Sequence, residues 1–284
     1  MHILFTSRRF ICLTVMLLMQ IGAIAQGETK ARKHKNGSFY FSWGYNQEWY
    51  TNSTVHIDQS ALGNSYDLEH MKAHDHLGWN NGLLNKALTI PQYNYRIGWY
   101  FNERQDMGLE FNFDHTKYIL TDGQYMQVVG KMNNMPVNKN MLFSQDSGFY
   151  YFLNNGANFF LFNFVKRTNL YSTKDNYLHI DLISKAGIGP VIPHVQNSLF
   201  GQINKQGFQF GGWNMGQENV IRATVMKYGF IEFSEKVDYA RYSHLKVYEG
   251  YARQSFGTIE FILSVGFILP SHKGNPLFDA GNKN

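Results

Sequence analysis

Two histidines in the first part of the chain have the spacing of a helical metal site. His70 and His74 are four residues apart, so a turn of helix would offer both imidazoles to one metal ion. The polar stretches around them and later in the chain hold further candidate ligands: His56, Glu69, Asp75, His76 and His194. The spacing fixes no third ligand, and a hydrated surface loop accounts for the same residues. We therefore assign no metal ligand and expect no cofactor.

Two adjacent pairs have residue types found in hydrolases. Asp114 precedes His115, and Ser243 precedes His244. A serine, a histidine and an acid in contact can act as nucleophile, base and orienting group. Asp114 and His115 are more simply explained as an acid on the inner face of a strand and a residue at its end. We therefore name no catalytic residue.

A basic run and a glycine pair complete the candidates. Residues 30–35 include four basic side chains, which could contact phosphate groups or simply be solvated. Gly187 and Gly189 lack the helix that a phosphate-binding loop requires. Glycines in a strand more often relieve crowding where side chains are packed closely. Neither feature predicts a cofactor site.

The start of the chain indicates that the protein is exported from the cytoplasm. Arg8 and Arg9 precede an apolar run from Phe10 to Ile24 that ends in the small-residue sequence Ala-Ile-Ala. This pattern predicts a secretory signal peptide over residues 1–25, cleaved before Gln26. The one cysteine, Cys12, lies within it. The mature chain is therefore predicted to have no disulfide and no cysteine nucleophile, and an exported chain meets no cytoplasmic nucleic acid.

Most of the remaining chain alternates apolar and polar residues, as β-strands with two different faces do. From Pro91 to Tyr118, for example, aromatic and aliphatic residues hold every second position around a short polar break. Near Gly211 and Gly212 the large apolar residues change from even to odd positions, which predicts a β-bulge. The predicted strands cover about residues 39–49, 92–101, 107–118, 157–167, 177–189, 208–225, 230–241 and 256–269.

Short and long connections alternate strictly between these strands. The short ones are about residues 102–106, 168–176 and 226–229, and the long ones about 50–91, 119–156, 190–207 and 242–255. An even strand number with short turns on one side and long loops on the other is typical of bacterial outer-membrane barrels.

Composition indicates which face of the strands is inside. Charged residues make up only 17% of the chain and aromatic residues 16%, so we expect the aromatic face to meet lipid and the polar face to line a lumen. A soluble sandwich is the competing interpretation, but its hydrated face would consist of Gly, Asn and Ser. We therefore predict an all-β fold, a closed antiparallel transmembrane barrel of eight strands. Residues 53–59, 66–71, 125–130 and 149–153 also alternate, and we interpret them as strands that protrude beyond the membrane. Ten or twelve spanning strands are the alternative.

This pattern resembles the small outer-membrane β-barrels of Gram-negative bacteria, of the type of the OmpA transmembrane domain and OmpX. The resemblance covers about Gly37 to Leu269 and includes no short diagnostic motif. It implies a periplasmic leader over residues 26–36, a barrel over 37–269 and a periplasmic tail over 270–284. Such barrels usually end on an aromatic last strand; here Phe267 has that place, but the tail follows it.

The resemblance implies an integral outer-membrane protein with a structural role or with surface loops that take part in binding or adhesion. It implies that the protein is not an enzyme. Its expected partners are lipopolysaccharide, phospholipid and, during insertion, the barrel-assembly machinery, with no nucleic acid. One alternative is an enzyme that modifies lipid A, since some small barrels carry such activity near the outer leaflet. The deacylase pattern of His, any residue, then Ser is absent, because Lys117 occupies the place of the serine after His115. The second alternative is a narrow pore or transporter.

Charged side chains on the predicted inner face should block the lumen. An eight-stranded interior is just wide enough for side chains to fill. A three-residue turn at residues 103–105 would place Arg96 opposite Asn112, with Glu110 and Asp114 as diagonal neighbours. Acids outnumber bases, so some are expected at hydrated mouths, protonated, or offset by His179. The inward charges are Arg96, Lys185, Arg222 and Lys236, with Glu110, Asp114, Asp181, Glu218, Glu232, Asp238 and Glu260.

Overall fold

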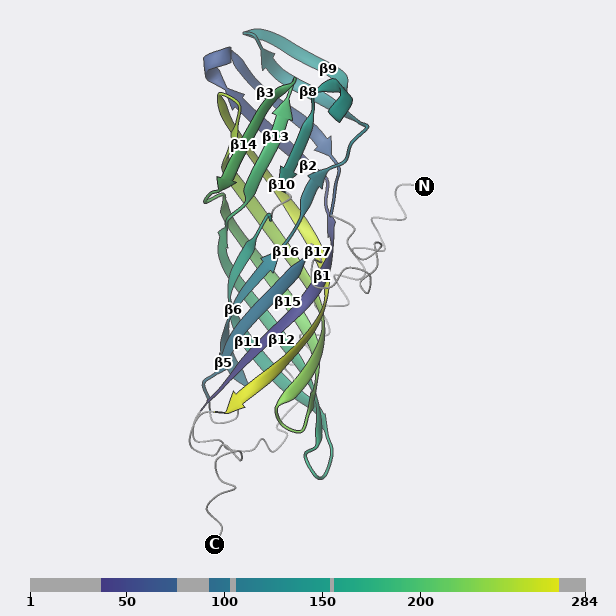
Figure 1. Ribbon diagram of the computed structural model, residues 1–284, viewed down its shortest axis with the longest axis vertical. Coiled ribbons are helices and arrows are strands. Elements are labelled where there is room, and N and C mark those ends of the chain that lie inside the picture. The colour runs from purple at the N-terminus through teal and green to yellow at the C-terminus, as the bar shows by residue number, and fades with distance from the viewer. Residues whose placement is uncertain (1–36, 76–91, 103–105, 154–155, 271–284) are drawn as a thin grey trace.

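The structure is a computed structural model that describes residues 37–75, 92–102, 106–153 and 156–270. These residues form one sheet of 17 strands (Figure 1), with short 3-10 turns at Ser60–Leu62 and Gln145–Ser147. Among these residues, no helix is long and apolar enough to cross a membrane. The predicted signal peptide, leader and tail, His76 and the turn at residues 103–105 lie outside the described residues.

One set of strands pairs in an unbroken antiparallel ring. Following paired residues from Phe39 once around the ring leads back to β1 at Trp49, ten residues further along (position 49 against 39). This stagger tilts the strands steeply against the barrel axis, as Figure 1 shows. The ring order is β1 (Ser38–Tyr50), β5 (Tyr93–Tyr100), β6 (Met107–His115), β11 (Phe159–Ser172), β12 (Leu178–Val191), β15 (Gly212–Val225), β16 (Gly229–Val247) and β17 (Gly250–Pro270), which returns to β1.

The ring has an apolar outer face and a polar inner face over the half that carries the short turns. Ile97, Phe162 and Ile231 are more than half exposed on the outside. Phe111 also faces outward, whereas Ile262 is buried inside. The predicted assignment of the two faces is therefore confirmed. In lipid, a closed ring of this kind leaves no backbone edge without a hydrogen-bond partner.

The other strands extend the barrel away from the short turns, and we call this part the head (Figure 1). The upper ends of β16 and β17, residues 242–254, belong to it as well. The remaining head strands are β2 (Ser53–Gln59), β3 (Asn64–Met71), β4 (Ala73–His74), β7 (Tyr118–Leu120), β8 (Gln124–Met132), β9 (Met135–Phe143), β10 (Tyr150–Leu153), β13 (His194–Leu199) and β14 (Gln202–Phe208).

Several head strands lie where the sequence predicted loops. The hairpin of β2 and β3 agrees with the alternation noted at residues 53–59 and 66–71. β8 and β10 likewise agree with the alternation noted at residues 125–130 and 149–153, whereas β9 and the hairpin β13–β14 were not predicted. In place of the predicted bulge, the strand expected from residue 208 to 225 is interrupted at residues 209–211, between the end of β14 and the start of β15. The large outward-facing residues change from even to odd positions there, from Phe208 to Trp213.

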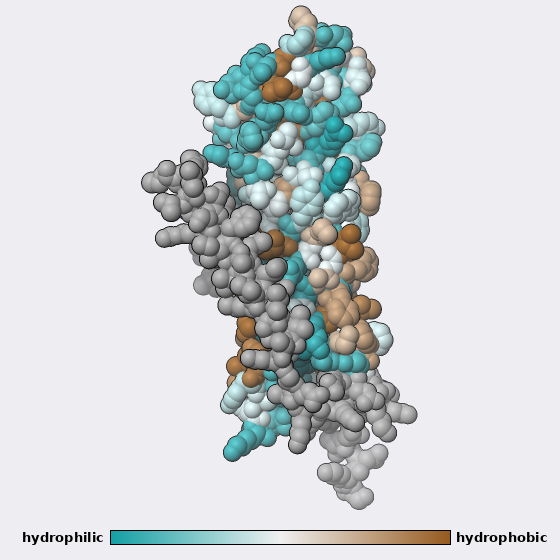
Figure 2. Space-filling view, turned by 180° about the vertical axis from the view of Figure 1, so that it is seen from behind, coloured by the Kyte–Doolittle hydropathy of each residue, from teal (hydrophilic) through white to brown (hydrophobic). Residues whose placement is uncertain are grey.

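The head has the opposite polarity to the ring below it. Val55, Leu68, Val128 and Leu245 belong to its completely buried apolar core. Its outer surface is mostly hydrophilic, whereas the apolar colour gathers on the lower half of the molecule (Figure 2). Such a core is what the hydrophobic effect produces in a β-structure surrounded by water. The head is therefore built like a soluble domain.

Lumen-facing glycines make room for aromatic rings near the short turns. A Cβ atom at Gly98 would lie 2.0 Å from the Tyr40 ring, and one at Gly266 would lie 2.3 Å from the Phe230 ring. Both distances are far below van der Waals contact. These two glycines therefore allow large side chains to fill a narrow lumen, as expected for glycines on this face.

The face assignment predicts unequal effects of two substitutions. Phe111→Lys would place a charge against acyl chains and should destabilise the barrel by about 2 to 4 kcal/mol. Ile262→Gln faces the polar lumen and should cost less. Urea unfolding of both variants in lipid vesicles, followed by the loss of heat-modifiable migration on gels, measures this. A larger loss for Ile262→Gln than for Phe111→Lys would contradict the assignment.

The head core predicts a substitution that loosens the head alone. Phe256 stacks on Tyr118, with ring centroids 4.2 Å apart, and also contacts Tyr242. Phe256→Ala should cost the head about 3 to 5 kcal/mol because it leaves a cavity among these rings. Limited proteolysis should then cut the head faster while migration of the unheated barrel is unchanged. Phe208→Ala, at an exposed ring, is the control, and equal cleavage of both variants would argue against this core.

Candidate functional site: the charged lumen

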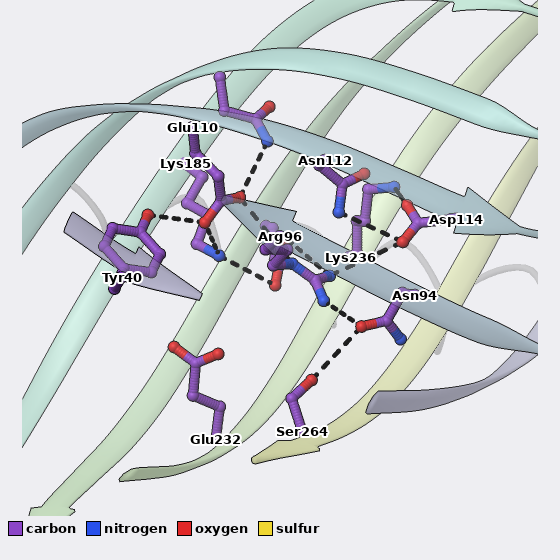
Figure 3. Close-up of polar contacts among 12 residues, drawn as sticks. Tyr40, Asn94, Arg96, Glu110, Asn112, Asp114, Lys185, Glu232, Lys236 and Ser264 are labelled. Carbon is purple, nitrogen blue, oxygen red and sulfur yellow. Dashed lines mark hydrogen bonds and ion pairs between the residues drawn. The ribbon is translucent and has the colours of Figure 1, made fainter. Parts of the chain in front are cut away.

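Arg96 lies in the middle of the lumen among carboxylates (Figure 3). β5 places it directly opposite Asn112 of β6, which is the predicted register. Its guanidinium nitrogens lie 3.2 Å from Glu218, 3.8 Å from Glu110 and 3.9 Å from Asp114. Each of these side chains is at most 2% exposed. The predicted diagonal pairing is confirmed, and Glu218 from the far side of the barrel completes it.

Lys185 is the second cation of this layer. Its Nζ lies 2.8 Å from Glu110 and 3.6 Å from Glu218, so both acids are shared with Arg96. The Tyr40 hydroxyl donates to Glu110 Oε2 at 2.7 Å, and the Asn163 amide donates to Oε1 at 3.2 Å. Two cations and two acids thus balance one another while neutral donors satisfy further oxygen lone pairs. Buried charges are stable only with such compensation.

Below this layer, Arg222 and Glu232 form a buried pair. They are direct cross-strand partners on β15 and β16, and their closest nitrogen and oxygen atoms are 2.6 Å apart. The Arg222 guanidinium also lies 4.6 Å from the Tyr40 ring centroid and 4.1 Å from that of Phe230. Aromatic faces attract a cation at such distances. This end of the lumen is therefore filled by charge and rings together.

Above Arg96, Lys236 gathers three acids. It forms ion pairs with Asp114, with Asp238 at 2.9 Å and with Glu260 at 3.7 Å. Glu48 faces Glu260 across the β1–β17 pair and is only 4% exposed. The surplus acids at this level are therefore buried, and the expectation that they lie at hydrated mouths is wrong for them.

Asp181 is paired with a base that was not among the predicted inward charges. Arg167 binds Asp181 at 2.8 Å, whereas His179 contacts the Ser172 hydroxyl at 2.9 Å. His179 therefore does not offset Asp181. Arg167 stands on β11 and is brought to β12 by the strand pairing, which the alternation of apolar residues alone did not indicate.

Glu48 and Tyr40 also belong to the lumen, and both occupy inward positions of β1, in step with Ser42 and Asn46. The alternation of residues 39–46 already places Tyr40 on the inner face. Glu48 was not predicted, although the same alternation continued by two residues reaches it. Tyr40 matters because it contacts both charged layers, Glu110 through its hydroxyl and Arg222 through its ring.

The residues considered for metal binding do not lie on a turn of helix. His70 lies near the end of β3 with a positive φ of 56°, and His74 lies in β4. His56 contacts Asp67 at 2.5 Å on the outside of the head, and Asp75 accepts a hydrogen bond from the Glu48 backbone. Among the described residues, no group of three or more His, Asp and Glu has the geometry of a metal site.

The residues considered for hydrolysis are also separated. Asp114 points into the lumen toward Lys236, whereas His115 contacts Asn158 at 2.8 Å and stacks on Tyr93. His244 packs against the Tyr251 ring on the head. The described residues therefore do not bring these acid, histidine and serine side chains together as one catalytic group.

Comparisons with known proteins give structural likeness only. No protein-family model matches the chain, and no curated protein does. Similar solved structures include OprG of Pseudomonas aeruginosa, 7% identical over 85% of this chain and 100% of that one, with a TM-score of 0.38. Ail of Yersinia pestis, in complex with the heparin analogue sucrose octasulfate, is 13% identical over 82% of this chain and 99% of that one, with a TM-score of 0.33. The outer-membrane protease OmpT of Escherichia coli is 9% identical over 85% of this chain and 99% of that one, with a TM-score of 0.31.

The class of the protein follows from the chain's own geometry. It has a closed antiparallel ring, an apolar outer band and a charged, buried lumen. A soluble barrel would have the opposite arrangement, as the head does. The protein is a Gram-negative outer-membrane β-barrel that crosses the membrane with several strands.

The Arg96 network predicts a large loss of stability on truncation. Arg96→Ala would leave Glu218, Glu110 and Asp114 short of a buried cation and should cost on the order of 3 to 5 kcal/mol. Urea unfolding in vesicles measures this, with Arg253→Ala, at an exposed arginine of β17, as the control. Adding Glu218→Gln to Arg96→Ala should recover part of the loss. A wild-type unfolding midpoint for Arg96→Ala would contradict the network.

Proposed function

We propose that the protein is a closed, non-conducting outer-membrane barrel that anchors a rigid β-structured head at the cell surface. In this proposal the eight strands of the ring are the ones that cross the membrane. The short turns face the periplasm, and the head projects outward to take part in binding or adhesion. The signal peptide, periplasmic leader and periplasmic tail predicted from the sequence complete the arrangement.

The observation that carries this proposal is that side chains fill the interior at two successive levels along the barrel axis. At the level of the apolar band, Arg96, Lys185 and their acids occupy the lumen. Above them, the apolar core of the head occupies the same axis (Figure 1). A solute would have to displace both a balanced charge network and a packed hydrophobic core. This double filling favours an anchor over a pore or transporter.

The head offers a candidate surface for binding. Its hairpin β8–β9 projects at the far end from the short turns (Figure 1). Within the described residues β9 pairs with β8 alone, and most of its side chains are exposed or partly exposed. Tyr125 and Met135 of this hairpin are 76% and 66% exposed. Pro136 and Lys139 lie on the open edge, where such residues hinder pairing with a further strand. Binding through side chains therefore fits this hairpin better than addition of a strand.

Modification of lipid A stays the alternative function. No observation among the described residues favours it, since Asp114 and His115 point in different directions. Incubation of the purified protein with labelled lipid A would detect acyl hydrolysis or transfer. Release or exchange of a labelled acyl chain would replace the anchor proposal with an enzymatic one.

The filled interior predicts the electrical behaviour of the protein. Wild-type protein inserted into a planar bilayer should give no stable conductance steps, because side chains occupy the interior at two levels, the charged lumen and the core of the head. Insertion is checked separately by heat-modifiable migration of the same preparation. Large, stable conductance from the wild-type protein would contradict the proposal.

The proposed orientation predicts which residues can be labelled from outside the cell. Asn138→Cys, in the projecting hairpin, should react in intact cells with a maleimide carrying a polymer too large to cross the outer membrane. Asp175→Cys, in the short turn between β11 and β12, should react only after the membrane is permeabilised. Since the mature chain is predicted to have no cysteine, the background is clean. Labelling of position 175 in intact cells would reverse the orientation.

A further inference from the structure

Exposed basic side chains gather on the outer surface where β16 and β17 continue from the ring into the head (Figure 1). We call this group the basic face, and its members are Arg241, His244, Lys246 and Arg253. Arg241 of β16 pairs with Ser255 of β17, and Lys246 pairs with Tyr251. Arg253 lies between these two β17 residues on the same outward face. The four side chains therefore share one surface of two adjacent strands.

The basic face begins where the apolar band ends in aromatic residues. Trp213 and Tyr239 face outward there, and their ring centroids are 5.8 Å apart. Trp213 is the cross-strand partner of Arg241, and Tyr239 precedes Arg241 by two residues on the same face of β16. Aromatic residues at the border of such a band lie at the level of the lipid headgroups. The basic face therefore starts at that level and continues away from the acyl chains.

The long cationic side chains of the basic face carry uncompensated charge. Among the described residues, no ion pair joins Arg241, Lys246 or Arg253 to a carboxylate. At the other end of the barrel, by contrast, the exposed Lys166 pairs with Asp106 at 2.6 Å. Positive charge gathered on one surface without such partners attracts anions.

The acidic residues near the basic face do not neutralise it. Asp67 of β3 contacts His56 at 2.5 Å, and Asp58 of β2 accepts hydrogen bonds from the 3-10 turn that follows it. One further acid, Glu249, lies in the turn between β16 and β17, at the far end of these strands from the ring. Arg241 lies closer to the membrane than any of them, so the headgroup side of the basic face is purely cationic.

A phosphate-bearing lipid headgroup is the anion that fits this position. Arginine binds phosphate through two parallel hydrogen bonds, and basic surfaces at headgroup level bind anionic headgroups. Lys246 Nζ and the His244 ring each lie 5.3 Å from the Tyr251 ring centroid, so contact with this ring positions them on the strand surface. Lipopolysaccharide carries phosphate groups directly above its acyl chains. We propose that the basic face binds the phosphorylated headgroup of a lipopolysaccharide molecule whose acyl chains lie against the aromatic residues below. This inference rests on the proposed function, in which the head faces the cell surface.

Binding of labelled lipid A to the purified protein in detergent tests the site. Arg241→Gln/Arg253→Gln should raise the dissociation constant at least about tenfold, because each basic residue adds to the attraction of an anionic headgroup. Lys174→Gln/Lys227→Gln makes the same change of charge at exposed lysines of the short turns and should leave the constant unchanged. Heat-modifiable migration shows that both variants fold. Equal weakening by the two variants, or none by the arginine variant, would overturn the proposal.

Two further measurements distinguish a lipid headgroup from free phosphate. Lipid A without its phosphates should bind the wild type more weakly than lipid A does, and should bind the arginine variant equally weakly. Inorganic phosphate in large excess should not displace labelled lipid A, and displacement would identify a site for free phosphate instead. Binding in detergent does not depend on orientation in the cell. Failure of the binding test therefore overturns this inference alone, whereas labelling of Asp175→Cys in intact cells would overturn the proposed orientation on which it rests.

Discussion

The hydrogen bonds that join β1 to β17 are the constraint on which the rest of the structure depends. In lipid, an unpaired strand edge is too costly, so the first and last strands of the ring must meet. They do so in register from Ser38 with Pro270 to Tyr50 with Thr258. Closure with the observed stagger leaves an interior only wide enough for side chains. Every inward residue must then fit its neighbours, which is why Gly98 lies under Tyr40 and why Arg96 reaches acids of both β6 and β15.

The surroundings of the barrel change from lipid to water along its axis, and the inward residues of the strands change from charged to apolar. The lower part of β16 turns Glu232 and Lys236 inward and Phe233 outward. Its upper part turns Tyr242 and Leu245 inward and exposes Lys246. Lipid outside gives no hydrophobic driving force for an apolar interior, so the lower lumen is held by ion pairs and hydrogen bonds. Water outside the head restores that driving force, and the head forms an apolar core.

Local rules predicted the ring well because alternation and short turns fix both face and register. The Arg96–Asn112 pairing followed from one short turn and the rule that a slip by one residue would expose the wrong face. Contacts that form only when the ring closes could not be predicted from local sequence patterns. Glu218 comes to Arg96 from across the lumen, since β15 is not adjacent to β5 in the ring. No local sequence pattern indicates that β5 and β15 face each other across the lumen.

The errors have separate physical causes. β9 was missed because water surrounds most of its side chains, so no apolar alternation marks it as a strand. The stretch around His70 and His74, which the sequence favoured as a hydrated loop, contains strands instead, because pairing places Ala73 and His74 opposite Leu120 and Ile119 of β7.

Tyr50 contacts both the charged lumen and the apolar core of the head. Its hydroxyl contacts the Glu48 carboxylate and lies 2.6 Å from the Lys117 carbonyl oxygen, at the upper limit of the charged lumen. Its ring packs edge-on against Tyr118 and Phe256, in the core of the head. An aromatic residue with one polar atom can satisfy both environments at once. Tyr50 therefore connects the charged lumen directly to the apolar core of the head.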